Sequence, residues 1–385
     1  MKSSYKRLGD YIREVNIRNA NLKDVKLLGV SIQKEFIPSI ANTIGTNMST
    51  YKLIKKNQFA YGPVTSRNGD KISVALLGDY EEAIISQAYT SFEIIDEDEL
   101  LPEYLMMWFR RPEFDRYARF MSHGSAREIF GWEEMCNTTL PVPSIIKQKE
   151  IVNEYNVLRD RISLNNWIVE KLEETAQTIY KQWFVDFEYP DENGKPYKSG
   201  GGEMEFNEVF DKEIPKGWYN TKMNELYEFQ YGFGNVNPDN GGEYPVYGSN
   251  GIIGSYDKYN NEDAPVIGHI GANCGSLVFA QGKHFVTYNG VMCKIKKGFD
   301  KHFGYSVLLN QDLKSNVRGT SQPFISYDML NEIDIIIPDK EFLNKFCRLL
   351  NPIFELINTK KNETVLLTSL SNTVLSKLST LGESL

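Results

Sequence analysis

Reactive residue types are scarce in this chain of 385 residues. It has four cysteines and four histidines, and no two cysteines form a Cys-x-x-Cys pair. A zinc site of the usual spacing is therefore not expected, and free thiols, as in the cytoplasm, are the default expectation. No apolar run approaches the roughly 20 residues that span a bilayer. The charged N-terminal segment is unlike an export signal. We therefore expect a cytoplasmic protein.

The motifs of common catalytic sites are also missing. There is no Gly-x-x-x-x-Gly-Lys-Ser/Thr loop for nucleotides, no Gly-x-Ser-x-Gly turn and no His-Glu-x-x-His pair. No Pro-Pro dipeptide occurs, which excludes the Asn/Asp-Pro-Pro-aromatic motif of adenine methyltransferases. The Pro-Asp pairs lack a suitably placed Glu-x-Lys of the kind that nucleases use. The sequence thus predicts no catalytic residue, no metal site and no cofactor on this chain.

The net charge of −8 does not favour a nucleic-acid partner. However, the excess acid is concentrated in residues 146–215, which carry 9 Lys and Arg against 15 Asp and Glu. The other segments are nearly neutral, and local charge governs contact with phosphates. Local basic faces on those segments therefore remain compatible with DNA binding.

The chain contains an internal repeat at an offset of 195 residues. Residues 124–133 (GSAREIFGWE) align without a gap on residues 319–328 (GTSQPFISYD), with residues of similar type at most positions. The same offset places Leu140–Pro143 on Ile335–Pro338. We therefore predict that one structural module occurs twice.

Each copy of the repeat is followed by a predicted helix of about 35 residues, or roughly 50 Å. Apolar residues recur there at alternating steps of four and three, which is the pattern of a coiled-coil seam. We expect the two helices to pair antiparallel, with the polar residues Asn165 and Lys360 fixing the register. The alternative is that each helix packs only on its own globule. The predicted seam residues are Ile151, Tyr155, Leu158, Ile162, Asn165, Val169, Leu172, Ile179, Trp183, Phe346, Leu350, Ile353, Ile357, Lys360, Leu367, Val374 and Leu378.

The predicted fold class is α+β: two mixed α/β globules separated by two long antiparallel coiled-coil helices, in a pseudo-twofold internal repeat. The linker is marked by a cluster of Gly, Pro, Asn and Asp without an apolar period. The predicted boundaries are a first globule at 1–145, a long helix at 146–188, a linker at 189–215, a second globule at 216–340 and a second long helix at 341–385.

Within the globules, short apolar runs predict strands at 75–77, 83–85, 90–95, 264–268, 276–279, 285–288 and 291–295. Helices are predicted at 102–120 and 303–314. The Gly- and Asn-rich segment 245–259 is long and polar, so no plain hairpin is expected there.

Four segments together resemble the specificity subunits of Type I restriction-modification systems, and the resemblance covers nearly the whole chain. YKQWFVDF (180–187, followed by NGKPYK at 193–198) is similar to that family's central conserved region, and IPKGW (214–218) is similar to the entry of its second target-recognition domain. YPVYGSNGIIG (244–254, continuing to GANCG at 271–275) is similar to one common class of such domain, and GTSQP (319–323) is similar to the lead into the second helix. The first globule lacks the third segment, so we expect a domain of a different class there.

The resemblance implies a non-catalytic DNA-binding subunit that reads an interrupted, two-part target. Each globule would be a target-recognition domain for one half, and the helices would set the spacing between the halves. Its partners would be double-stranded DNA, two modification (methyltransferase) subunits and restriction-translocase subunits, with no membrane. S-adenosylmethionine, ATP and magnesium would be bound by those subunits. The alternatives are a subunit of a methylation-only or fused system, a coiled-coil adaptor without DNA, and a self-contained restriction or modification enzyme.

Candidate DNA contacts are polar, basic or aromatic residues on predicted loops. Base edges are read by Arg, Asn, Gln, Ser or Lys, and phosphates are bound by Lys, Arg or backbone amides. Arg127 and Gln322 occupy equivalent places after a small-residue turn, although that turn could equally serve only to close the domain. Lone histidines are more often structural than functional. The candidates are Tyr61, Arg67, Lys71, His123, Ser125, Arg127, Ser249, Asn250, His269, Asn273, Tyr288, Asn289, Arg318 and Gln322.

Overall fold

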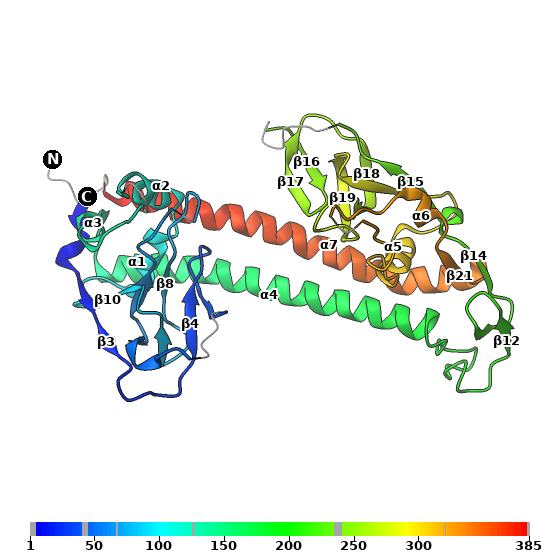
Figure 1. Ribbon diagram of the computed structural model, residues 1–385, viewed down its shortest axis with the longest axis horizontal. Helices are drawn as coiled ribbons and strands as arrows, with labels where there is room; N and C mark the ends of the chain where they lie inside the picture. The colour runs from blue at the N-terminus through cyan, green and yellow to red at the C-terminus, as the bar shows by residue number, and fades with distance from the viewer. Residues whose placement is uncertain are drawn as a thin grey trace. The chain divides into compact units, whose positions relative to one another are not determined.

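The computed structural model describes residues 5–40, 45–66, 68–124, 128–234, 241–319 and 321–382. The chain forms two compact units. Unit 1 consists of Met1–Leu164 and Thr364–Leu385, and unit 2 consists of Asn165–Glu363. Each unit contains one strand-rich globule and part of each of two long helices, α4 and α7 (Figure 1).

Unit 1 is built on two antiparallel-rich sheets, with strand orders β2-β10-β7-β8 and β3-β6-β9-β4-β5, and on the pair β1-β11. Its elements are β1 (Tyr5–Arg7), η1 (Leu8–Asp10), β2 (Ile12–Val15), β3 (Ile17–Arg18), β4 (Leu27–Val30), β5 (Phe36–Pro38), η2 (Met48–Thr50), β6 (Lys52–Lys55), β7 (Phe59–Tyr61), β8 (Val74–Leu76), β9 (Glu82–Ile85), β10 (Thr90–Ile94), α1 (Pro102–Phe109), α2 (Pro112–Phe120), α3 (Trp132–Asn137), β11 (Thr139–Pro141) and the first part of α4 (Ile145–Phe184). The end of α7 and η4 (Leu378–Gly382) complete it.

The single helix predicted at 102–120 is two helices in the structure, α1 and α2. Arg111 has φ −70° and ψ 137°, which is the extended backbone favoured before a proline, and Pro112 starts the next helix. Seven of the eight residues of α1, including Met106 and Trp108, are buried in the core of unit 1. The break at Pro112 therefore lets α1 lie inside the globule while α2 covers it.

Unit 2 has a sheet of order β15-β20-β18-β19-β16-β17 and the pairs β14-β21 and β12-β13. Its elements are the rest of α4, β12 (Met204–Asn207), β13 (Lys212–Pro215), β14 (Tyr219–Lys222), η3 (Met223–Glu225), β15 (Tyr227–Tyr231), β16 (Tyr244–Gly248), β17 (Gly251–Tyr256), β18 (Asn261–Gly268), β19 (Leu277–Val286), β20 (Gly290–Ile295), α5 (Lys301–Leu309), α6 (Tyr327–Asn331), β21 (Asp334–Ile337) and the start of α7 (Lys340–Lys377).

Two local predictions in unit 2 were wrong. The polar segment near 245–259 is a hairpin, because β16 and β17 pair antiparallel around a short turn that ends at Gly251 with φ 79°. Glycine has no Cβ and adopts this left-handed conformation without strain, so the turn can be tight. The strands predicted at 276–279 and 285–288 are one long strand, β19, which crosses Gly282 with φ 65°.

The two units repeat one strand arrangement. β1 and β11 pair Arg7 with Thr139, and β14 and β21 pair Lys222 with Asp334. The orders β2-β10-β7-β8 and β15-β20-β18-β19 match strand by strand. In both units the first strand of a hairpin also pairs in parallel with a later strand, as β4 with β9 and β16 with β19. The predicted internal repeat is therefore confirmed. The two domains share this strand arrangement, although the first lacks the sequence signature from which a different class was expected.

The helices α4 and α7 run antiparallel within unit 2, where they lie side by side (Figure 1). Near the end of α4, the ring of Trp183 lies 5.4 Å from that of Phe346. Further back along α4, Glu173 accepts a hydrogen bond of 2.8 Å from Lys361. In unit 1, Ile151 of α4 and Leu378 at the end of α7 share one core. The predicted α+β class with two long antiparallel helices is thus confirmed.

Every predicted seam residue has a side chain that is buried or half-buried. The buried ones are Ile151, Tyr155, Asn165, Phe346, Leu350, Ile357, Val374 and Leu378. The half-buried ones are Leu158, Ile162, Val169, Leu172, Ile179, Trp183, Ile353, Lys360 and Leu367. Among the described residues, neither amide atom of the fully buried Asn165 has a hydrogen-bond partner. Such a group costs stability, in keeping with a residue that restricts helix register.

The first long helix ends earlier than predicted, at Phe184 rather than at residue 188. Phe187 has φ 60°, which a continuing α-helix cannot accommodate, and Glu188 donates its backbone N–H back to the carbonyl of Gln182. Tyr180 and Phe184, which the seam omits, are also buried. The Phe184 ring contacts both Phe346 and Trp218, so this end of α4 packs on two sides.

Candidate nucleic-acid interface

In unit 2, a glycine marks the place where two loops meet. A Cβ on Gly268 would lie 2.5 Å from the carbonyl oxygen of Asn273, 2.6 Å from Ser276 Oγ and 2.8 Å from the carbonyl oxygen of Ser249. Ser276 Oγ also donates a 2.6 Å hydrogen bond to that Ser249 oxygen. The close approach, which only glycine permits, brings the β16–β17 turn onto the loop between β18 and β19.

His269 joins this cluster to two further segments. Its backbone N–H donates to the carbonyl of Asn289 at 2.8 Å, and its carbonyl accepts from Ile325 N–H at 3.0 Å. Its Nδ1 lies 2.7 Å from the Ile325 carbonyl oxygen, which can only accept, so Nδ1 donates and Nε2 is left as an acceptor. The ring packs against Tyr231 with centroids 4.3 Å apart. The histidine is therefore both structural and partly exposed at the loop surface.

The predicted candidates of unit 2 thus converge on one loop cluster. Ser249, His269, Asn273 and Asn289 are joined directly by the contacts above. Arg318 reaches the cluster through a short antiparallel bridge to Phe324, and Phe324 also bridges to Ile270. The side chains left exposed on these loops are those of Asn250, Asn273, Tyr288, Arg318 and Gln322.

The same construction occurs in unit 1. His123 and Ile129 form an antiparallel backbone bridge, and Ile129 also forms one with Val64. The first of these is equivalent, at the 195-residue offset, to the bridge between Arg318 and Phe324 in unit 2. A Cβ on Gly62 would lie 2.6 Å from Ser73 Oγ, the same distance as from Gly268 to Ser276 Oγ. The loops that follow β7 and α2 are therefore the counterparts of those that follow β18 and α5, and they expose Lys71 and His123.

Tyr61 is a correction to the predicted set. It is fully buried in the core of unit 1, where its ring contacts those of Phe92 and Phe130, and burial raises its pKa. It is the last residue of β7, directly before Gly62, and its side chain points inward because alternate strand residues face opposite sides. It therefore supports the loop and does not contact DNA. Arg67, Ser125 and Arg127 lie outside the described residues.

Further residues, not predicted from the sequence, hold these loops together. Ser276 and its counterpart Ser73 close each loop onto its glycine. In unit 1, Thr65 N–H donates to the carbonyl of Glu128, and Arg119 forms an ion pair with the Glu128 carboxylate. Serine and threonine next to glycine are common in loops, so only the pairing of the two halves could have singled them out.

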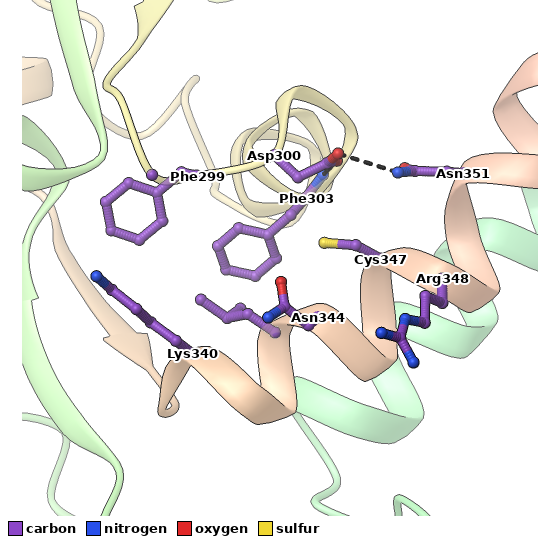
Figure 2. A pocket seen from close by; sticks show the side chains of 10 residues that line it. Phe299, Asp300, Phe303, Lys340, Asn344, Cys347, Arg348 and Asn351 are labelled. Carbon is purple, nitrogen blue, oxygen red and sulfur yellow. Dashed lines mark hydrogen bonds between the residues drawn. The ribbon is translucent and has the colours of Figure 1, made fainter.

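A cavity of about 420 Å³ lies elsewhere in unit 2, between the start of α5 and the first turns of α7 (Figure 2). Asp300 and Asn351 face each other across it and share a 3.0 Å hydrogen bond (Figure 2). Phe299, Phe303 and Cys347 form its apolar part. At the equivalent place in unit 1, Gln148 is buried and hydrogen-bonds to Leu101 N–H and to the Glu99 and Pro143 carbonyls. Leu343, which lines the cavity, stands at the position equivalent to that glutamine.

No group of three or more metal-ligating side chains occurs within the part of the chain that the structure describes. None of the helices described is long and apolar enough to cross a membrane.

The fold and the loops together define a duplicated α+β protein with one polar loop cluster in each half. Residues 215–367 match the family model of the Type I restriction modification DNA specificity domain. The chain is 25% identical over 321 residues to the Type I restriction enzyme MjaIX specificity subunit of Methanocaldococcus jannaschii, a match that covers 74% of this chain and 70% of that protein.

Two further relatives agree with this match. The Type I restriction enzyme HindI specificity subunit of Haemophilus influenzae is 28% identical over 141 residues, which is 36% of this chain and 30% of that protein. The crystal structure of a Type I restriction-modification S subunit from M. genitalium has the same fold, with a TM-score of 0.59, 15% identity and coverage of 97% of this chain and 95% of that one. Residues 215–367 therefore match a DNA specificity domain of this type, and the chain as a whole is similar to specificity subunits of Type I restriction-modification systems.

Proposed function

We propose that this chain recognises DNA for a Type I restriction-modification complex, in which each unit reads one half of an interrupted target. The observation that carries the proposal is the loop cluster built twice on the same strands. The supporting residues Gly62 and Gly268 correspond, whereas the exposed side chains differ, as in His123 against Arg318. Equal frameworks with different polar side chains suit two domains that read different base sequences.

The chain is the non-catalytic component, as its relatives are specificity subunits. We propose two modification subunits and the restriction-translocase subunits as its protein partners. In this proposal they bind S-adenosylmethionine, ATP and magnesium, and they recognise the long helices. Those helices would also set the number of unspecified base pairs between the half-sites.

Methylation mapping of the host genome tests the proposal. Deletion of this chain should abolish methylation at one two-part adenine motif and leave other motifs unchanged. Arg318→Ala should relax or weaken recognition of one half of that motif, by about 1–3 kcal/mol if the arginine contacts a base. His123→Ala should affect only the other half. A motif that persists after deletion would contradict the proposal, and would favour a coiled-coil adaptor that does not bind DNA.

A further inference from the structure

A second cavity, in unit 1, is lined by an unusual number of cations. It has a volume of about 390 Å³ and lies between the β4–β5 turn, the α1–α2 junction and the part of α4 and α7 that belongs to unit 1. Four basic side chains line it, against two acidic ones. The basic residues are Lys34, Lys71, Arg110 and Arg159, and the acidic residues are Glu35 and Asp115.

Both carboxylates are already engaged. Lys34 Nζ lies 2.6 Å from Asp115 Oδ1 in a buried ion pair, and Ile72 N–H donates to the same oxygen at 3.1 Å. Arg159 and Glu35 form an ion pair of 2.7 Å. Among the described residues, neither Lys71 nor Arg110 forms an ion pair, so the lining keeps an excess of positive charge. Burial, followed by the charge of Arg159, lowers the pKa of Arg110.

The fold does not require these cations, because the equivalent cavity in unit 2 has none. That cavity, of about 180 Å³, is lined by Glu173, Gln177, Tyr305, Asn310 and Phe354 among others. At the 195-residue offset, Phe354 corresponds to Arg159, and Gln177 corresponds to Asn372 of the unit 1 cavity. The two cavities are therefore matched in position and opposite in charge, and the charges of Lys71 and Arg110, for which the described part of unit 1 shows no ion pair, are left for a ligand.

The cavity adjoins the candidate interface of unit 1. Lys34 lies on the β4–β5 turn, the counterpart of the β16–β17 turn that carries Ser249 and Asn250. Lys71 lies on the loop after β7, whose residue Thr65 is hydrogen-bonded to Glu128. Two of the loops that would face DNA thus supply part of the cavity lining.

We propose that this cavity binds a phosphate group of the DNA backbone beside the half-site read by unit 1, and that unit 2 has no such clamp. The proposal rests on the proposed function. Guanidinium and ammonium groups together favour a phosphate as ligand. The cavity is also far larger than a single carboxylate would need. A contact with a phosphate does not distinguish one base from another. It should therefore strengthen binding of the half-site read by unit 1 and make that binding more sensitive to salt than binding of the other half-site.

The test measures duplex binding by the complex of this chain with its modification subunits, over a range of salt concentrations. Arg159→Gln should make the plot of log affinity against log salt shallower by about 1, equally for the target and for random DNA. Arg159→Lys should retain the wild-type slope. Arg116→Gln, which removes an exposed charge of unit 1 outside the cavity, is the matched control.

The outcomes separate this inference from the proposed function. If the wild-type complex binds no DNA, both fail. If it binds its target but Arg159→Gln behaves as Arg116→Gln does, only the phosphate clamp is wrong. If inorganic phosphate raises the melting temperature of wild type but not of Arg159→Gln, while their DNA slopes agree, the cavity binds a free phosphate compound and the DNA source is overturned. If Arg159→Gln instead loses its modification subunits at an unchanged slope, the cavity binds an acidic protein surface, which also overturns the inference.

Discussion

At the scale of single residues, the polar loops depend on a few buried contacts beneath them. Gly268 and Ser276 hold two loops of unit 2 together, and Gly62 and Ser73 join the two ends of the β7–β8 loop in unit 1. Asp115 holds Lys34 under the β4–β5 turn. Because these groups are buried, the interface is stiffened from below, and the exposed side chains can vary without loss of the framework.

Replacement of Asp115 by alanine should destabilise unit 1 strongly. The change leaves the ammonium of Lys34, which is 5% exposed, buried without its carboxylate. We expect a loss of about 3–5 kcal/mol in the free energy of unfolding, measured by urea denaturation. Glu81→Ala, which breaks an exposed ion pair with Lys56, should cost less than about 1 kcal/mol. The double variant Lys34→Met, Asp115→Leu should recover most of the loss, and a failure to do so would show that packing, not charge, is decisive.

Protonation of His302 should weaken unit 2 in mild acid. The ring is buried, stacks on Phe354 and has Nδ1 2.9 Å from Asn351 Oδ1, and burial lowers its pKa below the usual 6.5. The unfolded chain therefore takes up a proton near pH 6.5 before the folded chain does. Stability is complete above that pH and falls as the pH drops below it, by at most about 1.4 kcal/mol per pH unit.

Urea unfolding of wild type and His302→Gln at about pH 8 and about pH 5.5 measures this effect. The difference in unfolding free energy between the two pH values should be smaller in the variant. The comparison at the higher pH isolates the cost of lost packing, because there the histidine is neutral in both states. An equal pH dependence in both proteins would assign the acid sensitivity to other groups, such as the buried His284, whose pKa burial also lowers.

At the scale of secondary-structure elements, corresponding hairpins and helices make different contacts in the two units. The β16–β17 turn reaches Ser276 beside the loop cluster, whereas the longer β4–β5 turn carries Lys34 to Asp115. The start of α4 is closed by Gln148, whereas the start of α7 leaves a cavity beside α5. The two units thus share one fold, and differences in turn length and in single residues determine which side chains meet in each unit.

The N-terminus of α5 should depend on Asp300. Its carboxylate accepts from the backbone N–H groups of His302 at 2.8 Å and Phe303 at 3.1 Å, and from Asn351 Nδ2 at 3.0 Å. Asp300→Ala should therefore cost about 1–2 kcal/mol of stability in a urea titration. Asp300→Asn should cost less, since asparagine also caps helices. Equal losses for both variants would mean that the charge, rather than the cap, matters.

At the scale of the whole molecule, the proposed spacing function makes a geometric prediction. An insertion of one heptad in α4 and one at the facing position of α7 keeps the seam in phase and lengthens the pair by roughly 10 Å. At about 3.4 Å per base pair, the methylated motif should gain about three unspecified base pairs. Seven residues added to the linker between α4 and β12 should leave the spacing unchanged. An unchanged motif in the heptad variant, read by methylation mapping, would refute a role of the helices in spacing.

Much of the architecture could be predicted from the sequence, because repeats and heptads are local patterns. The 195-residue offset and the alternating apolar steps follow from which residues each helix must bury. The break between α1 and α2 was missed although Pro112 is visible, because residues with good helix propensity stand on both sides of it. The shared strand arrangement of the two domains was not predicted, because strand pairings such as β4 with β9 join residues far apart in sequence.

The order of the amino acids is enough to establish that the chain is duplicated and that it carries two long helices. Covalent order and hydrophobic periodicity are sufficient for both. The tertiary structure was needed to show which loop residues meet, that Tyr61 is a core residue, and that four cations of unit 1 line one cavity whose equivalent in unit 2 contains none. Those facts depend on distances between segments that are remote along the chain, and such distances are set by packing rather than by any local pattern.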